Sequence, residues 1–250
     1  MYLDKAKIKQ SFAVASKTYD EGAQLQRKVG NALIDKLSPA ATVLDLGCGT
    51  GFLTSKLSDY AENVIALDIA LPMLQVTQKK GLNNARYLCA DAEQLPLADH
   101  SVDSVVSNLA LQWCVNLDVV FSDIKRVLKS DGQLVFSIFG PQTLQELKAA
   151  WATVDDFQHV NDFYNPHQLF DFLKRAGFTE ISLDSAIYYP SYSSVWALMK
   201  ELKQIGAHNM TDGRSKKITG KSTMQRMLAA YSQQDDRIVA TFEVISVQAR

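Results

Sequence analysis

The 250-residue sequence predicts an α/β fold with a doubly wound, mostly parallel sheet of seven strands, an antiparallel last strand and a helical lid. Short apolar runs rich in β-branched residues alternate with helix-like segments between residues 42 and 154, as is typical of parallel strands joined by right-handed crossovers. The runs are continuously apolar, as expected for strands buried on both faces. Two later strand-like runs flank a long insertion, so we expect an antiparallel pair that carries a lid.

The first element is a helical segment over residues 5–37, where apolar side chains recur at steps of three and four residues until Ser38 and Pro39 end the pattern. The strands that follow are expected at 42–47, 63–69, 85–91, 101–109, 132–140, 179–190 and 237–250. The helices between them are expected at 51–60, 72–80, 118–128, 142–154 and 167–178, the last capped at its C-terminal end by Gly177.

These elements predict a single domain over residues 1–250. Residues 1–38 are expected to form an N-terminal helical cover, 39–190 and 236–250 the α/β core, and 191–235 a helical lid. The lid segment has helical apolar spacing and is richer in Lys and Arg than the rest of the chain.

Composition excludes several functional classes. The net charge of −1 gives no general affinity for nucleic acid or an acidic membrane, and no apolar run approaches the roughly 20 residues of a membrane span. The N-terminus has no apolar stretch long enough for a signal peptide. The three cysteines are far apart, and the four histidines make no ligand pattern with acids, so we expect no disulfide and no metal. A cytoplasmic protein is expected.

The segment "VLDLGCGTG" (43–51) is the strongest candidate for a ligand-binding loop, because it follows a predicted strand and opens a predicted helix. Its glycines, Gly47, Gly49 and Gly51, fall on every second position, which differs from the dinucleotide spacing G-x-G-x-x-G. No Gly-Lys-Ser/Thr follows, so a phosphate-binding P-loop is excluded. Glycines that only form a tight turn are the structural alternative.

Two acids end the next two predicted strands. Asp68 lies where a carboxylate can take both hydroxyls of a ribose, and Asp91 could reach the exocyclic amine of an adenine. The structural alternatives are a helix N-cap for Asp68 and a turn residue for Asp91. With the glycine loop, the two acids suit a nucleoside without a diphosphate.

The sequence Asp45–Gly51, followed by Asp68 and Asp91, resembles the class I S-adenosylmethionine-dependent methyltransferases, which have a Rossmann-like sheet. The resemblance implies that the loop packs under the methionyl part of this cofactor, that Asp68 binds the ribose, and that Asp91 and Ala92 flank the adenine. The implied cofactor-binding residues are Gln26, Asp45, Gly47, Cys48, Gly49, Gly51, Asp68, Ile69, Met73, Asp91, Ala92, Asn108 and Leu109.

Four further segments narrow the resemblance: "IKQSFAVASKTYDEGAQLQR", "SNLALQWCVNL", "FGPQTLQELKAAW" and "LKQIGAHN" are similar to the malonyl-acyl-carrier-protein O-methyltransferase family of biotin synthesis. Thr50 departs from relatives that have proline at that position, but the glycines are unchanged. The resemblance implies methylation of the free carboxylate of a malonyl thioester.

The residues expected near the acceptor suit this reaction. A carboxylate with a pKa of roughly 4 is already ionised and needs no general base, and "SNLALQWC" (107–114) has no acid, His or Lys. Methylation of a carbon, as on a quinone precursor, would need such a base. An anionic acceptor does need a cation, because it must be oriented.

Arg214 is the first candidate for that cation, with Lys203 and His208 as weaker candidates; solvated lid charges are the alternative. Tyr19, expected to be catalytic with Arg214, and Gln26 could close over the cofactor or the reacting carboxylate, although Tyr19 could equally pack within the helix. Trp113 is expected to line the substrate site rather than the core.

A basic patch on the predicted lid suits an acidic acyl-carrier protein. It comprises Arg214, Lys216, Lys217, Lys221 and Arg226, with no acid between them. An ordinary solvated face is the alternative. Two other functional classes remain open: a dinucleotide oxidoreductase, which the glycine spacing disfavours, and a non-catalytic protein that binds S-adenosylmethionine.

Overall fold

The computed structural model describes residues 3–207, 220–233 and 236–250, and within them seven strands form one sheet in the order β3-β2-β1-β4-β5-β9-β6. Only β9 runs antiparallel to its neighbours, β5 and β6. The predicted fold class is therefore confirmed. The strands are β1 Ala40–Leu46, β2 Ala61–Asp68, β3 Ala85–Cys89, β4 Val102–Asn108, β5 Leu128–Phe139, β6 Ile181–Tyr188 and β9 Phe242–Ala249.

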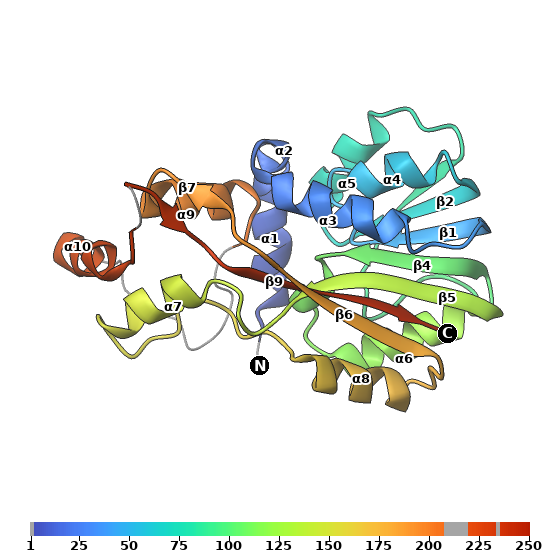
Figure 1. The fold of residues 1–250 in the computed structure, drawn as a ribbon. Helices are drawn as coiled ribbons and strands as arrows, with labels where there is room; N and C mark the ends of the chain where they lie inside the picture. Colours follow the sequence, from blue (N-terminus) through green and yellow to red (C-terminus); the bar gives the residue numbers. More distant parts are fainter. Residues whose placement is uncertain (1–2, 208–219, 234–235) are drawn as a thin grey trace.

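Helices cover both faces of the sheet (Figure 1). On one face lie α3 (Gln24–Ile34), α4 (Phe52–Leu57) and α5 (Leu71–Gln78); on the other lie α6 (Leu117–Val127) and α8 (Pro166–Arg175). Successive side chains of β1 point to opposite faces, so Val43 packs with Leu53 of α4, whereas Leu44 packs in the cluster that contains Phe121 of α6.

The chain crosses between the two halves of the sheet at its centre, where β2 pairs with one side of β1 and β4 with the other. In an open α/β sheet, ligands bind beyond the carboxyl ends of the strands at such a point. The fold therefore places a binding crevice where β1, β2 and β4 end.

The helix predicted over residues 5–37 is wrong in its continuity, because the structure has α1 (Lys5–Ala15), α2 (Tyr19–Gly22) and α3 in its place. The chain turns after Ala15: the Thr18 N–H donates to the Ala15 carbonyl, and the Thr18 hydroxyl donates to the carbonyl of Gln204 at 3.0 Å. α1 contacts α5 of the core while α2 contacts α9, which lies outside it. Because α1 and α2 pack against different partners, three separate helices form instead of one straight helix.

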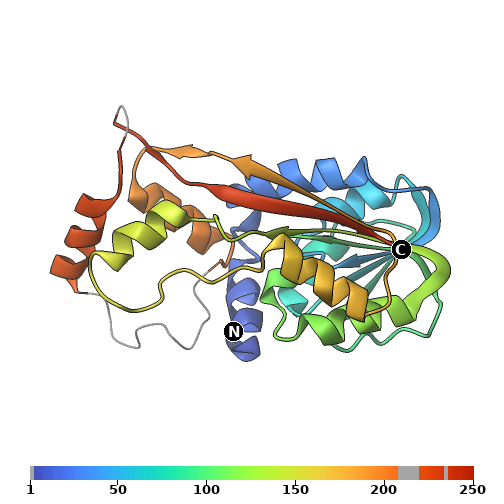
Figure 2. The same cartoon turned by 60° about the horizontal axis from the view of Figure 1, so that its bottom comes forward.

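The outlying region is built from α7 (Gln145–Ala152), α9 (Val195–Gln204), α10 (Lys221–Ala230) and a short antiparallel pair, β7 (Ser191–Tyr192) and β8 (Ile238–Val239). The β7–β8 pair was not predicted, although the flanking antiparallel strands were. Figures 1 and 2 both show α1 between this region and the sheet. The region has its own buried cluster, which includes Trp151, Leu198 and Met227.

The Gly177 cap is confirmed: Gly177 follows α8 with φ +91°, and the N–H of Phe178 donates to the carbonyl of Leu173. None of the helices in the described ranges is both long enough and apolar enough to cross a membrane.

Candidate active site

The glycine loop connects β1 to α4 at the central crevice, and all three glycines have positive φ: Gly47 +75°, Gly49 +54° and Gly51 +79°. A Cβ on Gly47 would overlap the side chain of Ala110, and one on Gly51 would overlap Thr77. A Cβ on Gly49 would meet no protein atom within 4 Å. Two glycines are therefore required by packing, whereas Gly49 leaves space open to a ligand.

Asp68 ends β2 and holds the loop from the opposite side of the crevice. One carboxylate oxygen accepts from the N–H of Gly49 at 2.9 Å, and the other accepts from the N–H of Ala70 at 2.8 Å. Burial raises the pKa of Asp68, and the backbone donors oppose this. The N-cap of α5 is Ala70, so Asp68 is not the helix cap considered from sequence. Each carboxylate oxygen keeps a lone pair for a ligand.

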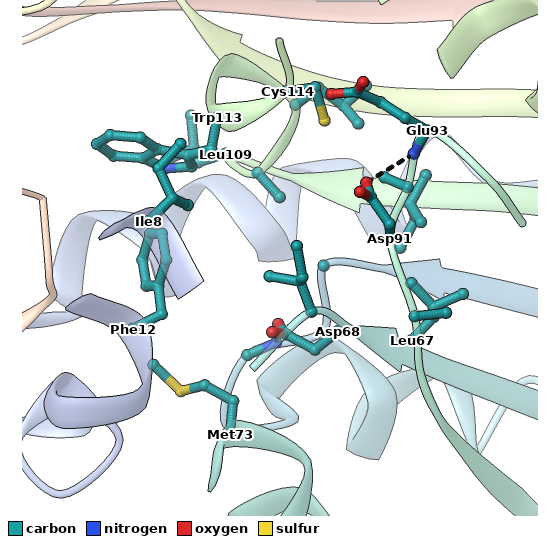
Figure 3. Close-up of a pocket in the computed structure, with 18 of the residues that line it drawn as sticks. Ile8, Phe12, Leu67, Asp68, Met73, Asp91, Glu93, Leu109, Trp113 and Cys114 are labelled. Carbon is teal, nitrogen blue, oxygen red and sulfur yellow. Dashed lines mark hydrogen bonds between the residues drawn. The ribbon is translucent and has the colours of Figure 1, made fainter. Parts of the chain in front are cut away.

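Asp91 follows β3 and lies across the same pocket from α1 (Figure 3). Its carboxylate accepts from the N–H of Glu93 at 3.0 Å, so the turn considered from sequence does form. The Lys5 ammonium of α1 also lies 2.6 Å from Asp91 and 3.1 Å from Glu93. Asp91 is thus both a turn residue and part of the pocket wall.

One pocket brings together most of the predicted cofactor residues. Those that line it are Gly47, Gly49, Asp68, Ile69, Met73, Asp91, Ala92, Asn108 and Leu109, and the pocket also contains Tyr19 and Trp113, which were predicted for catalysis and for the substrate. A smaller side pocket shares Tyr19, Gly47, Gly49 and Asn108 with it and adds Gln26, Asp45 and Cys48.

Sequence reasoning missed the residues by which α1 closes the pocket, namely Lys5, Ile8 and Phe12, together with Glu93 and Cys114. Figure 3 shows Ile8 and Phe12 beside Trp113, facing Asp68 and Asp91. The rings of Phe12 and Trp113 meet edge to face with centroids 5.4 Å apart. Amphipathic spacing in residues 5–15 was the available signal, but it could not show which partner the apolar face meets.

The end of the site near Asp45 is enclosed. Asp45 is 1% exposed and accepts a hydrogen bond from the Thr54 hydroxyl at 2.6 Å; burial raises its pKa to about 7, and the bond from Thr54 works against this. Gln26 Oε1 is buried with no hydrogen-bond partner in the described part of the chain. An unpartnered buried amide oxygen is costly, and an ammonium group of a ligand would satisfy it. The Cys48 side chain packs in a small apolar cluster.

Asn108 and Leu109 end β4 beside the loop. Asn108 accepts from the Ser137 hydroxyl at 2.9 Å and donates to the carbonyl of Gln26 at 2.9 Å. Leu109 has φ +49°, a strained conformation for a residue with a side chain, and its N–H is held by Ser137 at 3.0 Å. Such strain is concentrated at functional sites in proteins.

The residues predicted to bind the substrate do not all lie at the pocket or within the described residues. Trp113, predicted for the substrate site, lines the pocket that holds the predicted cofactor residues, whereas Lys203 is exposed on α9 and does not line it. Arg214 and His208 lie outside the residues that the structure describes, as do Lys216 and Lys217. Within the described ranges, no three His, Cys, Asp or Glu side chains are grouped so that they could hold a metal ion.

Comparison with known proteins agrees with this geometry. Residues 44–136 match a family model described as a methyltransferase domain. The malonyl-acyl-carrier-protein O-methyltransferase of Methylovorus sp. (strain MP688) is 42% identical over an alignment of 260 residues, gaps included, and the alignment covers 97% of this chain and 88% of that protein. The biotin biosynthesis bifunctional protein BioHC of Cellvibrio japonicus is 39% identical and covers 97% of this chain and 49% of its own length.

Among solved structures, the YcgJ protein of Bacillus subtilis superposes with a TM-score of 0.64 at 17% identity, covering 88% of this chain and 96% of that one. At that identity the likeness concerns the fold alone. It agrees with the seven-stranded sheet described above.

Proposed function

Because the chain belongs to the malonyl-acyl-carrier-protein O-methyltransferase family, we propose that it methylates the free carboxylate of malonyl-acyl-carrier protein with S-adenosylmethionine as the donor, an early step of biotin synthesis. The observation that carries this proposal is the pocket at the ends of β1, β2 and β4, where Asp68 and Asp91 face space that Gly49 leaves open.

The pocket residues fit the cofactor part by part. Asp68 is suited to the ribose hydroxyls and Asp91 to the adenine amine, while Ile69 and Met73 offer apolar contact to the adenine ring. At the enclosed end, the unpartnered Gln26 Oε1 is suited to the ammonium of the methionyl part. When bound, S-adenosylmethionine supplies an electrophilic methyl group on a positively charged sulfur.

The side chains near the expected methyl acceptor favour a substrate group that is already ionised when it binds. Burial raises the pKa of the Cys114 thiol to about 12, and Glu93 and Asp91 add to the effect, so this thiol is no base at neutral pH. Burial, with Asp68 close by, likewise raises the pKa of Tyr19, which stays a neutral hydroxyl. A carboxylate needs only positioning and exclusion of water, which Tyr19 and the α1 cover supply. Carbon methylation would need a base, and neither Cys114 nor Tyr19 is one at neutral pH.

Arg214 remains a predicted cation for the malonyl carboxylate, without excluding a second cationic contact, and it lies outside the described residues. The proposal keeps the organisation expected from sequence, in which 1–38 cover the site and 191–235 form a lid. Two hydrogen bonds support a cover that joins core to lid: Thr50 donates to Asp20 at 2.8 Å, and Ser11 donates to the carbonyl of Gly206 at 3.0 Å.

Docking of the acidic carrier protein is proposed on the lid. Lys221 and Arg226 are exposed on α10, while Met227 of the same helix is buried, so α10 exposes two cations to a partner. Arg214, Lys216 and Lys217, the other members of the predicted patch, lie outside the described residues. The cytoplasm is the proposed location, and it is supported by the three cysteines, which are all free thiols.

The test is an assay with methyl-labelled S-adenosylmethionine and malonyl-acyl-carrier protein, followed by treatment with base. A methyl ester releases the label in base, whereas a methyl group on carbon or nitrogen is retained. Acetyl-acyl-carrier protein is the matched control, because it lacks the free carboxylate and should remain unlabelled. Label that resists base, or equal labelling of both substrates, would refute the proposed reaction.

A further inference from the structure

A second apolar pocket shares a wall with the cofactor pocket, and that wall is Trp113. The pocket lies between the end of β5, α7, the segment 159–163 and the C-terminal end of α9. Phe139, Leu147 and Leu202 are representative of its apolar walls. A substrate that must meet the methyl donor has to approach it from an adjoining space, and this pocket is such a space.

Among the described residues that line this pocket, His159 is the one with an acid–base side chain. His159 follows α7 in the chain, and its ring stacks on Trp151 with centroids 3.7 Å apart and planes 6° apart. Its Nε2 lies 2.7 Å from an Asp155 carboxylate oxygen. The ring is therefore held on one face by an aromatic surface and at one nitrogen by a carboxylate.

The pairing places an ionised carboxylate at one nitrogen of His159. The bonds from His159 and from the N–H of Phe157 outweigh the effect of burial and lower the pKa of Asp155, so Asp155 stays ionised. With Nε2 bonded to Asp155, Nδ1 makes no hydrogen bond to another described residue and is left for a ligand. A protonated Nδ1 is a charge-assisted donor to an anionic oxygen.

We propose that this second pocket receives the malonyl thioester, and that His159 is a specificity-determining residue that binds the malonyl carboxylate through Nδ1. The inference rests on the function proposed above and deepens it. A malonyl thioester combines an apolar acyl and thioester portion with a single anionic end, which matches an apolar pocket with one ionisable side chain. During transfer a carboxylate oxygen gains the methyl group and the sulfur loses it, so His159 neither gives nor takes a proton.

The test compares His159→Phe with His167→Phe. Phenylalanine preserves the stack on Trp151 but removes both nitrogens. His167 is the matched control. It also pairs with an aspartate four positions away in the sequence, Asp171, but its side chain is 85% exposed. Six quantities are measured for each variant: kcat and KM with malonyl-acyl-carrier protein, kcat and KM with malonyl-pantetheine, the Kd of S-adenosylhomocysteine, and the melting temperature.

For His159→Phe we expect kcat/KM to fall about 10- to 100-fold with both malonyl substrates, as for loss of one charge-assisted hydrogen bond, while the Kd of S-adenosylhomocysteine stays within about twofold. His167→Phe should match the wild type in every measurement. A His159→Phe enzyme that keeps kcat/KM within twofold overturns the inference. A wild type that methylates no malonyl thioester refutes the proposed function itself, which is a different result.

A second variant decides the question if His159→Phe does not fold. Leu202→Trp places bulk in the pocket from a half-buried position on α9, and Lys200→Trp places the same side chain on the exposed side of that helix. Leu202→Trp should raise the KM for malonyl-pantetheine at least about tenfold, with S-adenosylhomocysteine binding retained. Equal KM values for the two tryptophan variants would overturn the inference.

Discussion

Alanine substitutions at Gly49 and Gly51 test whether the loop has a packing function and a ligand function at separate positions. Both residues have positive φ, so a side chain at either costs about 1–2 kcal/mol of folding free energy. At Gly51 the added Cβ would also lie 2.9 Å from the Cβ and Oγ1 of Thr77, and overpacking of this kind costs a further ~1–3 kcal/mol. At Gly49 no protein atom lies within 4 Å of the added Cβ.

For a chain of this size, 1 kcal/mol shifts the melting temperature by roughly 2–4 °C. Gly51→Ala should therefore lower the melting temperature by about 4–20 °C, and Gly49→Ala by about 2–8 °C. Gly49→Ala should nevertheless weaken binding of S-adenosylhomocysteine at least about tenfold, since the methyl group occupies space meant for the ligand.

Differential scanning fluorimetry gives the melting temperatures, and isothermal titration with S-adenosylhomocysteine gives the affinities. The reasoning fails if Gly49→Ala binds this ligand as tightly as the wild type does. Equal destabilisation by the two variants would equally refute it, because the structure assigns the steric conflict to Gly51 alone of this pair.

Three further predictions concern other parts of the site. Burial raises the pKa of Asp45 to about 7, above its unfolded value, so its contribution to stability is present below pH ~4 and is lost as the pH rises through 7. In denaturant titrations, the free energy of unfolding of Asp45→Asn should therefore increase relative to that of the wild type between pH 5 and 8. A difference that stays constant over this range would contradict the prediction. Tyr19→Phe should lower kcat about tenfold by loss of one hydrogen bond without changing the pH–rate profile between pH 6 and 9. If the substitution removed one ionisation from that profile, Tyr19 would have to act as a base. Reversing the charge at Lys221 and Arg226 together should raise KM for malonyl-acyl-carrier protein but not for malonyl-coenzyme A. Lys80→Glu, in the exposed turn that follows α5, is the control; an equal loss with both substrates would argue against docking on α10.

Much of the core could be predicted from local pattern. Continuously apolar β-branched runs identified strands such as β2 and β4 because a strand buried on both faces needs that composition. Asp68 and Asp91 could be paired in advance, because the carboxyl ends of parallel strands meet at one edge of a sheet. Both acids do line one pocket.

Local pattern failed where contacts join distant segments. Residues 5–37 have the spacing of one helix, yet the chain breaks near Thr18 because α1 and α2 meet different partners. Lys5 reaches Asp91 across 86 residues of sequence, and nothing near Lys5 indicates that partner. Lys203, a weaker candidate for the substrate cation, lies on an exposed side of α9, and helical spacing alone does not say which face of that helix meets a substrate.

The sequence by itself therefore determined the α/β class, the loop with its three glycines, and the acids that end successive strands, because each depends on neighbours along the chain. Tertiary structure decided which of those glycines leaves space open beside it, that α1 closes the pocket, and that His159 lies on a second pocket beyond Trp113. The physical reason is that periodicity specifies local backbone and burial, whereas the meeting of side chains from separate elements depends on how those elements pack.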